Sequence, residues 1–550
     1  MAKENTKQVE VVDRLTTKVI VEKLKHLKAD RGNWEREWQD VADFILPRKN
    51  EVITKRTDGE RKTTYIFDNT AIVSNELLAG FLHGMLTSPN TPWFEFTTGD
   101  VDLDRDDDVR TYLQESARRV HNVLSNSNFN TEVHEMYMDL GAFNTACMFV
   151  EEVKPSEGRE VVRFSTKFIA NYYIDEDYLG KVNQVYQEWK WDAGKIVQAF
   201  GVEAVPPKIK DAYEKGKSEE YTIIHAMYPE YLIPNFKKSN KPWVSHYILP
   251  DLNADIKVER FFEIPCVVPR WAKASGEKYG RGPGMSAIPE VKSLNKMAEV
   301  VLKGAQKVVD PPLMVPDDGF IMPIRTKPAS LNYYRAGTTD VIRPIFNNTQ
   351  VDFGFQVMQE KRMRVREAFY IDQLISPTGG PARTATEVMQ RAEEQMRLMG
   401  PILGRQQSEF ARPLIDRVFG IMERRNMLPP PPELLQGRVV DVRYTSPIAK
   451  TQRLAEGNAI LRTVQAVAPF VQADPTILDN INGDAILRAL ADIYGFPQEG
   501  FRTRREVAQQ RQARAQQQQM AVAQQQQQAQ ADKTATEVDS MAKLMGAQGE

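Results

Sequence analysis

The chain has 550 residues, enough for three or four structural units and at least one sizeable core. Its 72 Lys and Arg residues are balanced by 74 Asp and Glu, so net charge provides no general attraction to nucleic acid or anionic lipid. With 41% apolar residues, the composition is that of a folded globular protein.

Cysteine content and hydropathy exclude several classes of protein. The two cysteines, Cys147 and Cys266, each lie in an apolar segment, and we interpret them as isolated buried thiols in a reducing compartment. They predict neither a metal cluster nor a disulfide framework. The N-terminal residues contain no apolar signal core, and no stretch approaches the ~18 apolar residues of a membrane span. We therefore expect neither export by a signal peptide nor membrane insertion.

The first half of the chain changes from helical to strand-like patterning. Apolar residues at helical spacing predict an amphipathic helical region from Val11 to Ile45 and helices over 70–87, 107–124 and 131–143. Short β-branched or aromatic runs separated by turn residues then continue to about Arg270, which predicts a β-rich middle.

Helical patterns return in the second half. Ser286–Val309 and Val351–Ile375 are predicted helices on either side of residues 311–349, which are rich in Pro and turn residues. The stretch "SPTGGPAR" then leads into a further pattern, Thr384–Met427, which begins with a capping box formed by Thr384 and Glu387.

The pattern from Thr384 to Met427 predicts one unusually long helix. At ~1.5 Å per residue its 44 residues would extend about 65 Å, far beyond an ordinary globular helix. Prolines in Gly400-Pro401 and Arg412-Pro413 each remove a backbone donor, so we expect kinks at both places.

The C-terminal part contains a short predicted strand, "RVVDVRYTS", and two amphipathic helices over 450–471 and 483–495. From Ala508 the sequence is dominated by Gln and Ala, which cannot form a packed core alone. We expect loose helix or disorder there.

Three near-matches to catalytic motifs fail because a required residue is replaced or a proline interrupts the turn. Gly216-Lys217-Ser218 lacks the rest of a phosphate-binding loop, and "HEMYM" from His134 has Met138 where a zinc helix needs its second histidine. Gly280 and Gly282 precede a helix, but Pro283 interrupts a dinucleotide turn, so we interpret them as a flexible lead-in. We expect no catalytic residue, no metal and no cofactor.

One enzymatic alternative remains open. Asp175 followed by Glu188 and Lys190 is a loose match to the carboxylates and lysine of metal-dependent nucleases or other DNA-processing enzymes. Two carboxylates would hold Mg²⁺ while the lysine positions the attacking water. Exposed Glu and Lys two residues apart on a strand are, however, common as a solvated surface.

Three segments carry a resemblance to a known family: "RGNWEREWQDVADFILP", "DNTAIVSNELLAGFLHGMLTSPNTPWFEF" and "TATEVMQRAEEQMRLMGPILGRQQSEFARPLIDRVFGIM". They resemble the head-to-tail connector, or portal, proteins of T7-like short-tailed bacteriophages. The resemblance implies an α+β, mainly helical subunit that assembles into a ring, usually of twelve copies. Such a subunit has a β-containing wing, a two-helix stem, a clip, a long kinked helix and a helical crown.

The resemblance assigns each part of the chain to one of these regions. The assignments are N-terminal helices and wing 1–285, first stem helix 286–310, clip 311–350, second stem helix 351–375, tunnel loop 376–383, long kinked helix and wing strand 384–449, crown 450–507, and Gln-rich tail 508–550.

The resemblance also implies which residues meet DNA and partners. In the tunnel loop, Pro377, Gly379, Gly380 and Pro381 favour a projecting loop that changes conformation. The expected DNA-contacting residues are Thr378, Gly379, Gly380 and Arg383 in the loop and Arg362 and Arg366 on the second stem helix. The expected partner-binding residues of the clip are Arg325, Lys327, Arg335 and Arg343.

The resulting expectation is a non-enzymatic channel at one capsid vertex through which double-stranded DNA enters and leaves. The implied partners are further copies of the chain, the terminase large subunit, a tail adaptor, and coat and scaffolding proteins. The implied location is the virion head-tail junction, after assembly in the host cytoplasm. A third interpretation is a structural protein of the virion without a DNA path.

Overall fold

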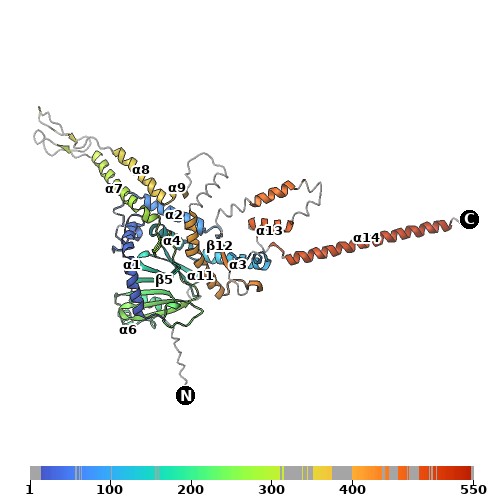
Figure 1. Ribbon diagram of the computed structural model, residues 1–550, viewed down its shortest axis with the longest axis horizontal. Coiled ribbons are helices and arrows are strands. Elements are labelled where there is room, and N and C mark those ends of the chain that lie inside the picture. Colours follow the sequence, from blue (N-terminus) through green and yellow to red (C-terminus); the bar gives the residue numbers. More distant parts are fainter. Residues whose placement is uncertain are drawn as a thin grey trace, which may run out of the picture. The chain divides into compact units, whose positions relative to one another are not determined.

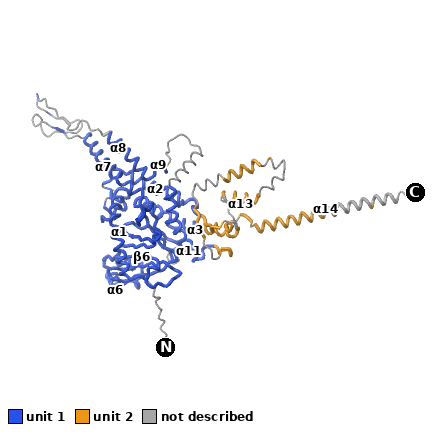
Figure 2. Tube along the Cα trace, viewed as in Figure 1, with its two compact units in different colours: residues 1–94, 118–428 blue, residues 95–117, 429–550 orange. Residues whose placement is uncertain are grey.

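The structure is a computed structural model in which the chain forms two compact units (Figure 2). Unit 1 comprises residues 1–94 and 118–428, and unit 2 comprises 95–117 and 429–550. The described residues are 14–55, 59–60, 62–63, 65–100, 102–154, 158, 160–309, 313–314, 333, 337, 343–344, 351–374, 399–435, 440–444, 456–467, 469, 482–494, 496, 500–502 and 504–546.

Helices predominate, and antiparallel sheets occupy the middle of the chain, so the predicted α+β, mainly helical class is confirmed (Figure 1). The N-terminal helices are α1 (Thr17–Phe44), α2 (Thr70–Leu86), α3 (Asp107–Ser125) and α4 (Phe129–Phe143), close to the predicted ranges. Short 3₁₀ turns occur at Pro47–Lys49, Leu103–Arg105, Ile169–Asn171, Glu230–Leu232, Pro250–Leu252 and Glu433–Leu435.

A five-stranded antiparallel sheet forms the larger β element of unit 1. Its strand order is β4 (Tyr172–Glu176), β5 (Val182–Asp192), β6 (Glu220–Pro229), β7 (Trp243–Leu249) and β8 (Ala254–Phe261). The β-rich middle is therefore as predicted.

Both faces of this sheet are covered, because neighbouring residues of a strand point to opposite sides. Ile224 on β6 packs with Ile20 and Leu24 of α1. Its neighbour Ile223 packs on the other face with α5 (Ala193–Phe200) and α6 (Pro207–Glu214). These two short helices were not predicted from the sequence.

A second sheet has three strands, of which two precede the larger sheet in the chain and the third follows it. It has the order β3 (Val162–Lys167), β2 (Cys147–Glu152) and β9 (Cys266–Val267), all antiparallel. The edge strand β9 leads, through a loop, into the first of two long helices.

Those two helices, α7 (Pro283–Val309) and α8 (Val351–Ala368), extend side by side from the rest of unit 1 (Figure 1). α7 begins three residues before the predicted Ser286. The predicted helix 351–375 is interrupted, because Tyr370 adopts φ 60° and a separate turn, α9 (Ile371–Leu374), follows. Between α7 and α8, β10 (Leu313–Met314) pairs with β11 (Arg343–Pro344).

The predicted long helix is described from residue 399 onward. Residues 399–406 are helical, a π-helical turn follows at Gln407–Ala411, and α11 (Arg412–Arg424) continues. The irregularity ends two residues before Pro413, whose ring removes a backbone donor, and the kink predicted there stays a prediction. Helix 399–406 continues through Pro401, whereas residues 384–398 lie outside the described part.

In the C-terminal region, β12 (Asp441–Tyr444) pairs with β1 (Phe94–Thr97). Residues 456–467 and α13 (Gly483–Tyr494) are helical, as their amphipathic patterns predict. The Gln-rich segment belongs to α14 (Arg504–Gly546), so of the two expected states the structure has helix.

Candidate functional site

The paired helices α7 and α8 correspond to the predicted stem. They approach closely at Gly354, where an added Cβ would lie 2.7 Å from Cγ2 of Val301. Met358 and Val365 of α8 are buried, and their spacing of seven residues places them on one helix face. The two helices therefore form a packed hairpin with one shared apolar seam.

The cationic run of α8 is paired within the chain. Nζ of Lys361 lies 2.7 Å from Oε2 of Glu290 on α7, and this hydrogen bond is the main reason that the pKa of Glu290 falls below its ordinary value. Arg364 pairs with Glu360 at 2.6 Å. These contacts neutralise much of the positive charge that the sequence displays.

Arg362 and Arg366, the two predicted DNA contacts of α8, have different surroundings. Arg362 lies 2.8 Å from Asp68, whose side chain is only 5% exposed, and Asn295 accepts the Asp68 backbone N–H. Arg366 pairs with Asp372 at 2.6 Å and is more exposed, 46% against 33% for Arg362. Arg362 thus fastens α8 to the segment before α2, and a DNA contact of either residue stays a prediction.

The other residues predicted to contact DNA or partners lie mostly outside the described part of the chain. This holds for Thr378, Gly379, Gly380 and Arg383 of the predicted tunnel loop and for Arg325, Lys327 and Arg335 of the predicted clip. Arg343 lies in β11, opposite Met314 of β10. Their roles remain expectations from the resemblance.

A buried charge network joins three segments of unit 1 and was not predicted from the sequence. Arg270, only 1% exposed, donates from Nη2 to Glu409 Oε1 at 2.7 Å and to the Gly180 carbonyl at 2.9 Å, and it also pairs with Glu176. Lys273 lies 2.7 Å from Glu176. We call Arg270, Glu176, Glu409 and Lys273 the Arg270 cluster.

The Arg270 cluster attaches the π-helical turn to the rest of unit 1. Burial disfavours the charge of Arg270, but hydrogen bonds from it to Glu409 and Glu176 raise its pKa. Gln406 also donates to the Arg270 carbonyl at 2.8 Å. The available sequence signal was the single arginine inside the apolar run "CVVPRWA", because a charge in a buried segment requires a partner.

The glycines before α7 are packing residues, which corrects the interpretation of a flexible lead-in. A Cβ on Gly280 would lie 2.2 Å from the Asn144 carbonyl oxygen, and one on Gly284 would lie 1.9 Å from the Ala142 carbonyl oxygen. Glycine is required because the start of α7 crosses the end of α4 at backbone contact distance. Asn144 itself adopts φ 62° where α4 ends.

The geometry disfavours the nuclease alternative. Asp175 pairs with Gln184 across β4 and β5, so Glu188 lies four residues further along β5, or about 13 Å at ~3.3 Å per residue. Asp175 contacts Lys23 and Lys278 at 2.6 and 2.9 Å, and their hydrogen bonds outweigh burial and lower its pKa. Glu188 contacts Lys28 at 2.5 Å. Lysines of helix α1 and of the loop before α7 therefore pair with these two carboxylates.

No set of three or more His, Cys, Asp or Glu residues is arranged to hold a metal within the described ranges. His134 lies beside His83, with ring centroids 6.1 Å apart, and this neighbour adds to burial in lowering the pKa of His83. None of the helices that the structure describes is both long and apolar enough to cross a bilayer.

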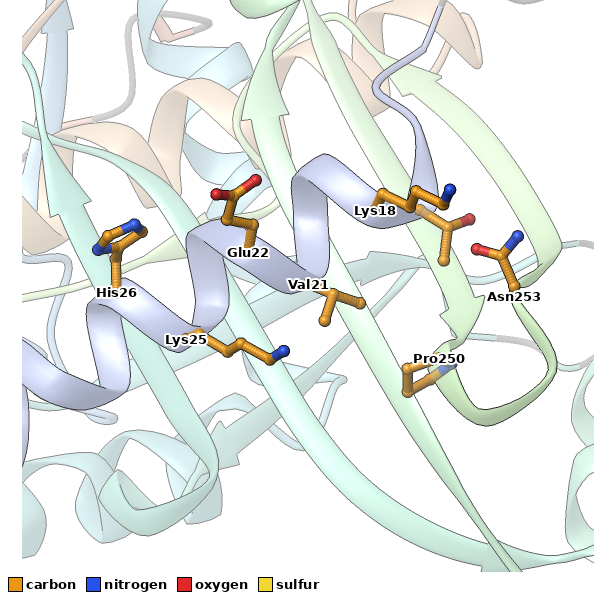
Figure 3. Close-up of a pocket in the computed structure, with 8 residues that line it drawn as sticks. Lys18, Val21, Glu22, Lys25, His26, Pro250 and Asn253 are labelled. Atoms are coloured by element: carbon orange, nitrogen blue, oxygen red, sulfur yellow. The ribbon is translucent and has the colours of Figure 1, made fainter.

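An open groove of about 710 Å³ lies between α1 and the turn joining β7 to β8 (Figure 3). Lys18, Lys25 and His26 line it together with Glu22, and Asn253 lies on the turn. The groove contains charges of both signs and none of the residues predicted to bind DNA or partners. Its lining therefore indicates no particular ligand.

Comparisons with known proteins relate the whole chain to one family. The family model described as bacteriophage head to tail connecting protein matches residues 17–502. A probable portal protein of Bordetella phage BPP-1 is 30% identical over 518 residues, which cover 92% of each chain. The portal protein of Salmonella phage epsilon15 is 28% identical, covering 90% of this chain and 91% of the relative.

A more distant relative is also a portal protein. The portal protein of Enterobacteria phage T3 is 21% identical and covers 86% of both chains. A solved neck of an empty GTA particle matches with a TM-score of 0.33 and 11% identity, covering 79% of this chain and 95% of that one, a likeness too low to carry an argument. The family match and the identity to BPP-1 are sufficient on their own: the chain belongs to the bacteriophage head to tail connecting protein family, the portal proteins of the phage head-tail junction.

Proposed function

We propose that copies of this chain close into a ring whose channel is surrounded by the α7–α8 stems, and that double-stranded DNA passes through this channel during packaging and ejection. The family membership supports a role at the head-tail junction. The ring and the DNA path are the steps that the proposal adds.

The observation that carries the proposal is the apolar surface of the stem hairpin. Large apolar side chains on α7 and α8 are exposed in the single chain, with Phe353 at 65%. The others are Val300, Leu302, Val308, Val309, Phe355 and Met363. Apolar surface of this extent on paired helices marks a protein contact, and in a ring the neighbouring copy would cover it through a heterologous interface.

The pairing of charges on the stem suits a channel through which DNA moves better than a site that binds DNA tightly. For each phosphate that a protein neutralises, log K of DNA binding falls by about 0.9 for every tenfold rise in salt concentration. Many unpaired cations facing the duplex would therefore bind it tightly and hold it in place. Lys361, Arg364 and Arg366 are instead paired with carboxylates of the same hairpin or of α9. We infer that the stem guides DNA without strong contacts.

The finer assignments follow from the resemblance and belong to the same proposal. They are a ring of twelve copies, a tunnel loop in which Gly379, Gly380 and Arg383 approach DNA, and a clip that meets the terminase large subunit and a tail adaptor. Coat and scaffolding proteins would surround the wing and crown. We infer no catalytic step for the chain itself, which leaves ATP hydrolysis to the terminase.

A charge placed in the exposed apolar surface tests the stem interface. Phe353→Asp should convert a large assembly of the purified chain into smaller species, because a carboxylate would be buried against the neighbouring copy. Size-exclusion chromatography with light scattering measures this. Gln198→Asp adds the same charge at an exposed polar position of α5, outside the stem, and should leave the assembly intact. An unchanged mass for Phe353→Asp would exclude the proposed stem contact.

A further inference from the structure

The only two cysteines of the chain meet inside unit 1. Sγ of Cys147 and Sγ of Cys266 are 2.8 Å apart, although 119 positions separate them in the sequence. Both are free thiols and both are buried, 0% and 1% exposed. The two thiols were predicted to be isolated, and the structure corrects this because β2 and β9 are paired strands.

The local geometry is that of a diagonal pair on one face of the sheet. Cys266 lies opposite Phe149, two residues from Cys147 along β2, so both cysteine side chains point to the same side. The right-handed twist of a sheet brings one such diagonal pair together. A further approach of about 0.8 Å would bring the two sulfurs to the ~2.05 Å of a disulfide bond.

We propose that Cys147 and Cys266 are a latent disulfide site: a dithiol in the newly folded chain that a small peroxide converts to a disulfide joining β2 to β9. The chain has no other cysteine, so no competing intramolecular pairing exists. A protein of the head-tail junction passes from the reducing interior of a cell to the outside with the virion, where disulfides persist. The inference does not depend on the ring or on the DNA path.

The reaction is balanced with hydrogen peroxide as the oxidant. The thiolate of Cys147 attacks one peroxide oxygen, the O–O bond breaks, and a sulfenic acid and hydroxide result. The sulfur of Cys266 then attacks the sulfenic sulfur, and the S–O bond breaks as the S–S bond forms. In total two thiols and one hydrogen peroxide give one disulfide and two waters.

The surroundings set the rate of this reaction. Burial raises the pKa of the Cys147 thiol well above its ordinary value, so little thiolate is present and the dithiol persists while peroxide is scarce. Lys167, directly opposite Cys147 on β3, acts in the other direction and favours the thiolate. A small, uncharged oxidant is required because neither sulfur is exposed.

The bond would fix the edge strand that precedes the Arg270 cluster. β9 ends at Val267, three residues before Arg270, and the backbone N–H of Trp271 donates to the Asn144 carbonyl at 2.9 Å. A disulfide from Cys266 to β2 would hold this segment covalently. It would also close a loop of more than a hundred residues, which restricts the unfolded chain.

Peptide mass spectrometry tests the proposal on the full-length folded chain. The chain is treated with hydrogen peroxide, quenched, unfolded in an alkylating reagent without reductant, and digested. We expect a linked pair of peptides containing Cys147 and Cys266, two hydrogens lighter than their sum and separated by dithiothreitol. The oxidised chain should melt a few degrees higher than the reduced chain. Cys147→Ser and Cys266→Ser should each lack both the linked peptides and the shift.

An internal control makes the negative result decisive. Met520, 62% exposed on α14, reports that peroxide has reached the protein. The proposal is overturned if Met520 is fully oxidised while both thiols are still alkylated. It is equally overturned if the cysteines give only sulfinic acids or bonds between chains.

Discussion

At the scale of single residues, unit 1 is organised around buried charges that each hold a distant segment. Arg270 holds the π-helical turn through Glu409 and the β4–β5 hairpin through Glu176 and the Gly180 carbonyl. Arg31, also buried, donates to the carbonyls of Ile169 and Tyr172 from α1. Burying such a charge is favourable only while every one of its partners is present. These arginines therefore stabilise the fold only when the segments that they join are correctly placed.

Substitution of Arg270 tests this interpretation. Arg270→Met should lower the free energy of unfolding by about 3 kcal/mol or more, because Glu409 and Glu176 lose their buried partner. Chemical denaturation monitored by circular dichroism measures the change. The matched control is Arg281→Met, whose side chain is 49% exposed and pairs with Glu277, so that a loss below about 1 kcal/mol is expected. Equal losses in the two variants would contradict the account.

Asp139 gives a prediction about pH. Burial raises its pKa to about 6, although Lys49 at 2.6 Å partly opposes this shift. The native state therefore holds a proton between about pH 4 and pH 6 that the unfolded chain releases, and the contribution of Asp139 to stability falls as pH rises through that window. Asp139→Asn cannot titrate.

The difference in unfolding free energy between the wild type and Asp139→Asn should change by roughly 2 to 3 kcal/mol from pH 4 to pH 7, to the disadvantage of the wild type. Urea titrations at several pH values measure it. If the unfolding free energies of the two proteins changed with pH in parallel, the pKa of Asp139 would not be raised in the folded state.

At the scale of elements, the junction of α4 and α7 determines how the α7–α8 hairpin extends from the rest of unit 1. Gly280, Gly282 and Gly284 lie against the last residues of α4, and the Trp271 N–H donates to the Asn144 carbonyl at the same place. The backbone contacts leave no space for side chains. The start of α7, and therefore the direction of the stem, is fixed by close packing of main chains.

Alanine substitutions at two glycines distinguish packing from helix propensity. Gly284→Ala should lower the unfolding free energy by about 2 kcal/mol or more, because its Cβ would collide with the Ala142 backbone. Gly32 lies in α1, and a Cβ added there would have no atom of another part of the chain within 4 Å. Gly32→Ala should therefore raise the unfolding free energy by about 0.5 to 1 kcal/mol. Melting temperatures of both variants report the signs. A neutral or stabilising Gly284→Ala would contradict close packing at this junction.

The elements also show how far sequence reasoning extends. Hydrophobic period predicted α2 and α3 nearly to the residue, because one face of each is buried. The interruption at Tyr370 was missed, since its positive φ depends on packing that no local pattern contains. The Arg270 cluster and the cysteine pair were missed for the same reason, because each joins residues about a hundred positions apart.

At the scale of the whole molecule, the stem surface is incomplete in a single chain. Met358 and Val365 of α8 are buried, yet Phe353, Phe355 and Met363 remain exposed. The membership in the connector family and this uncovered surface lead to the same expectation, a closed assembly of identical copies.

Electron microscopy of the purified full-length chain, together with its mass from light scattering, tests the central claim most directly. We predict closed rings with a central channel and a mass that is a whole multiple of 62.7 kDa, about twelvefold. A species of 62.7 kDa at every protein concentration and ionic strength, with no rings in the images, would contradict the proposed channel.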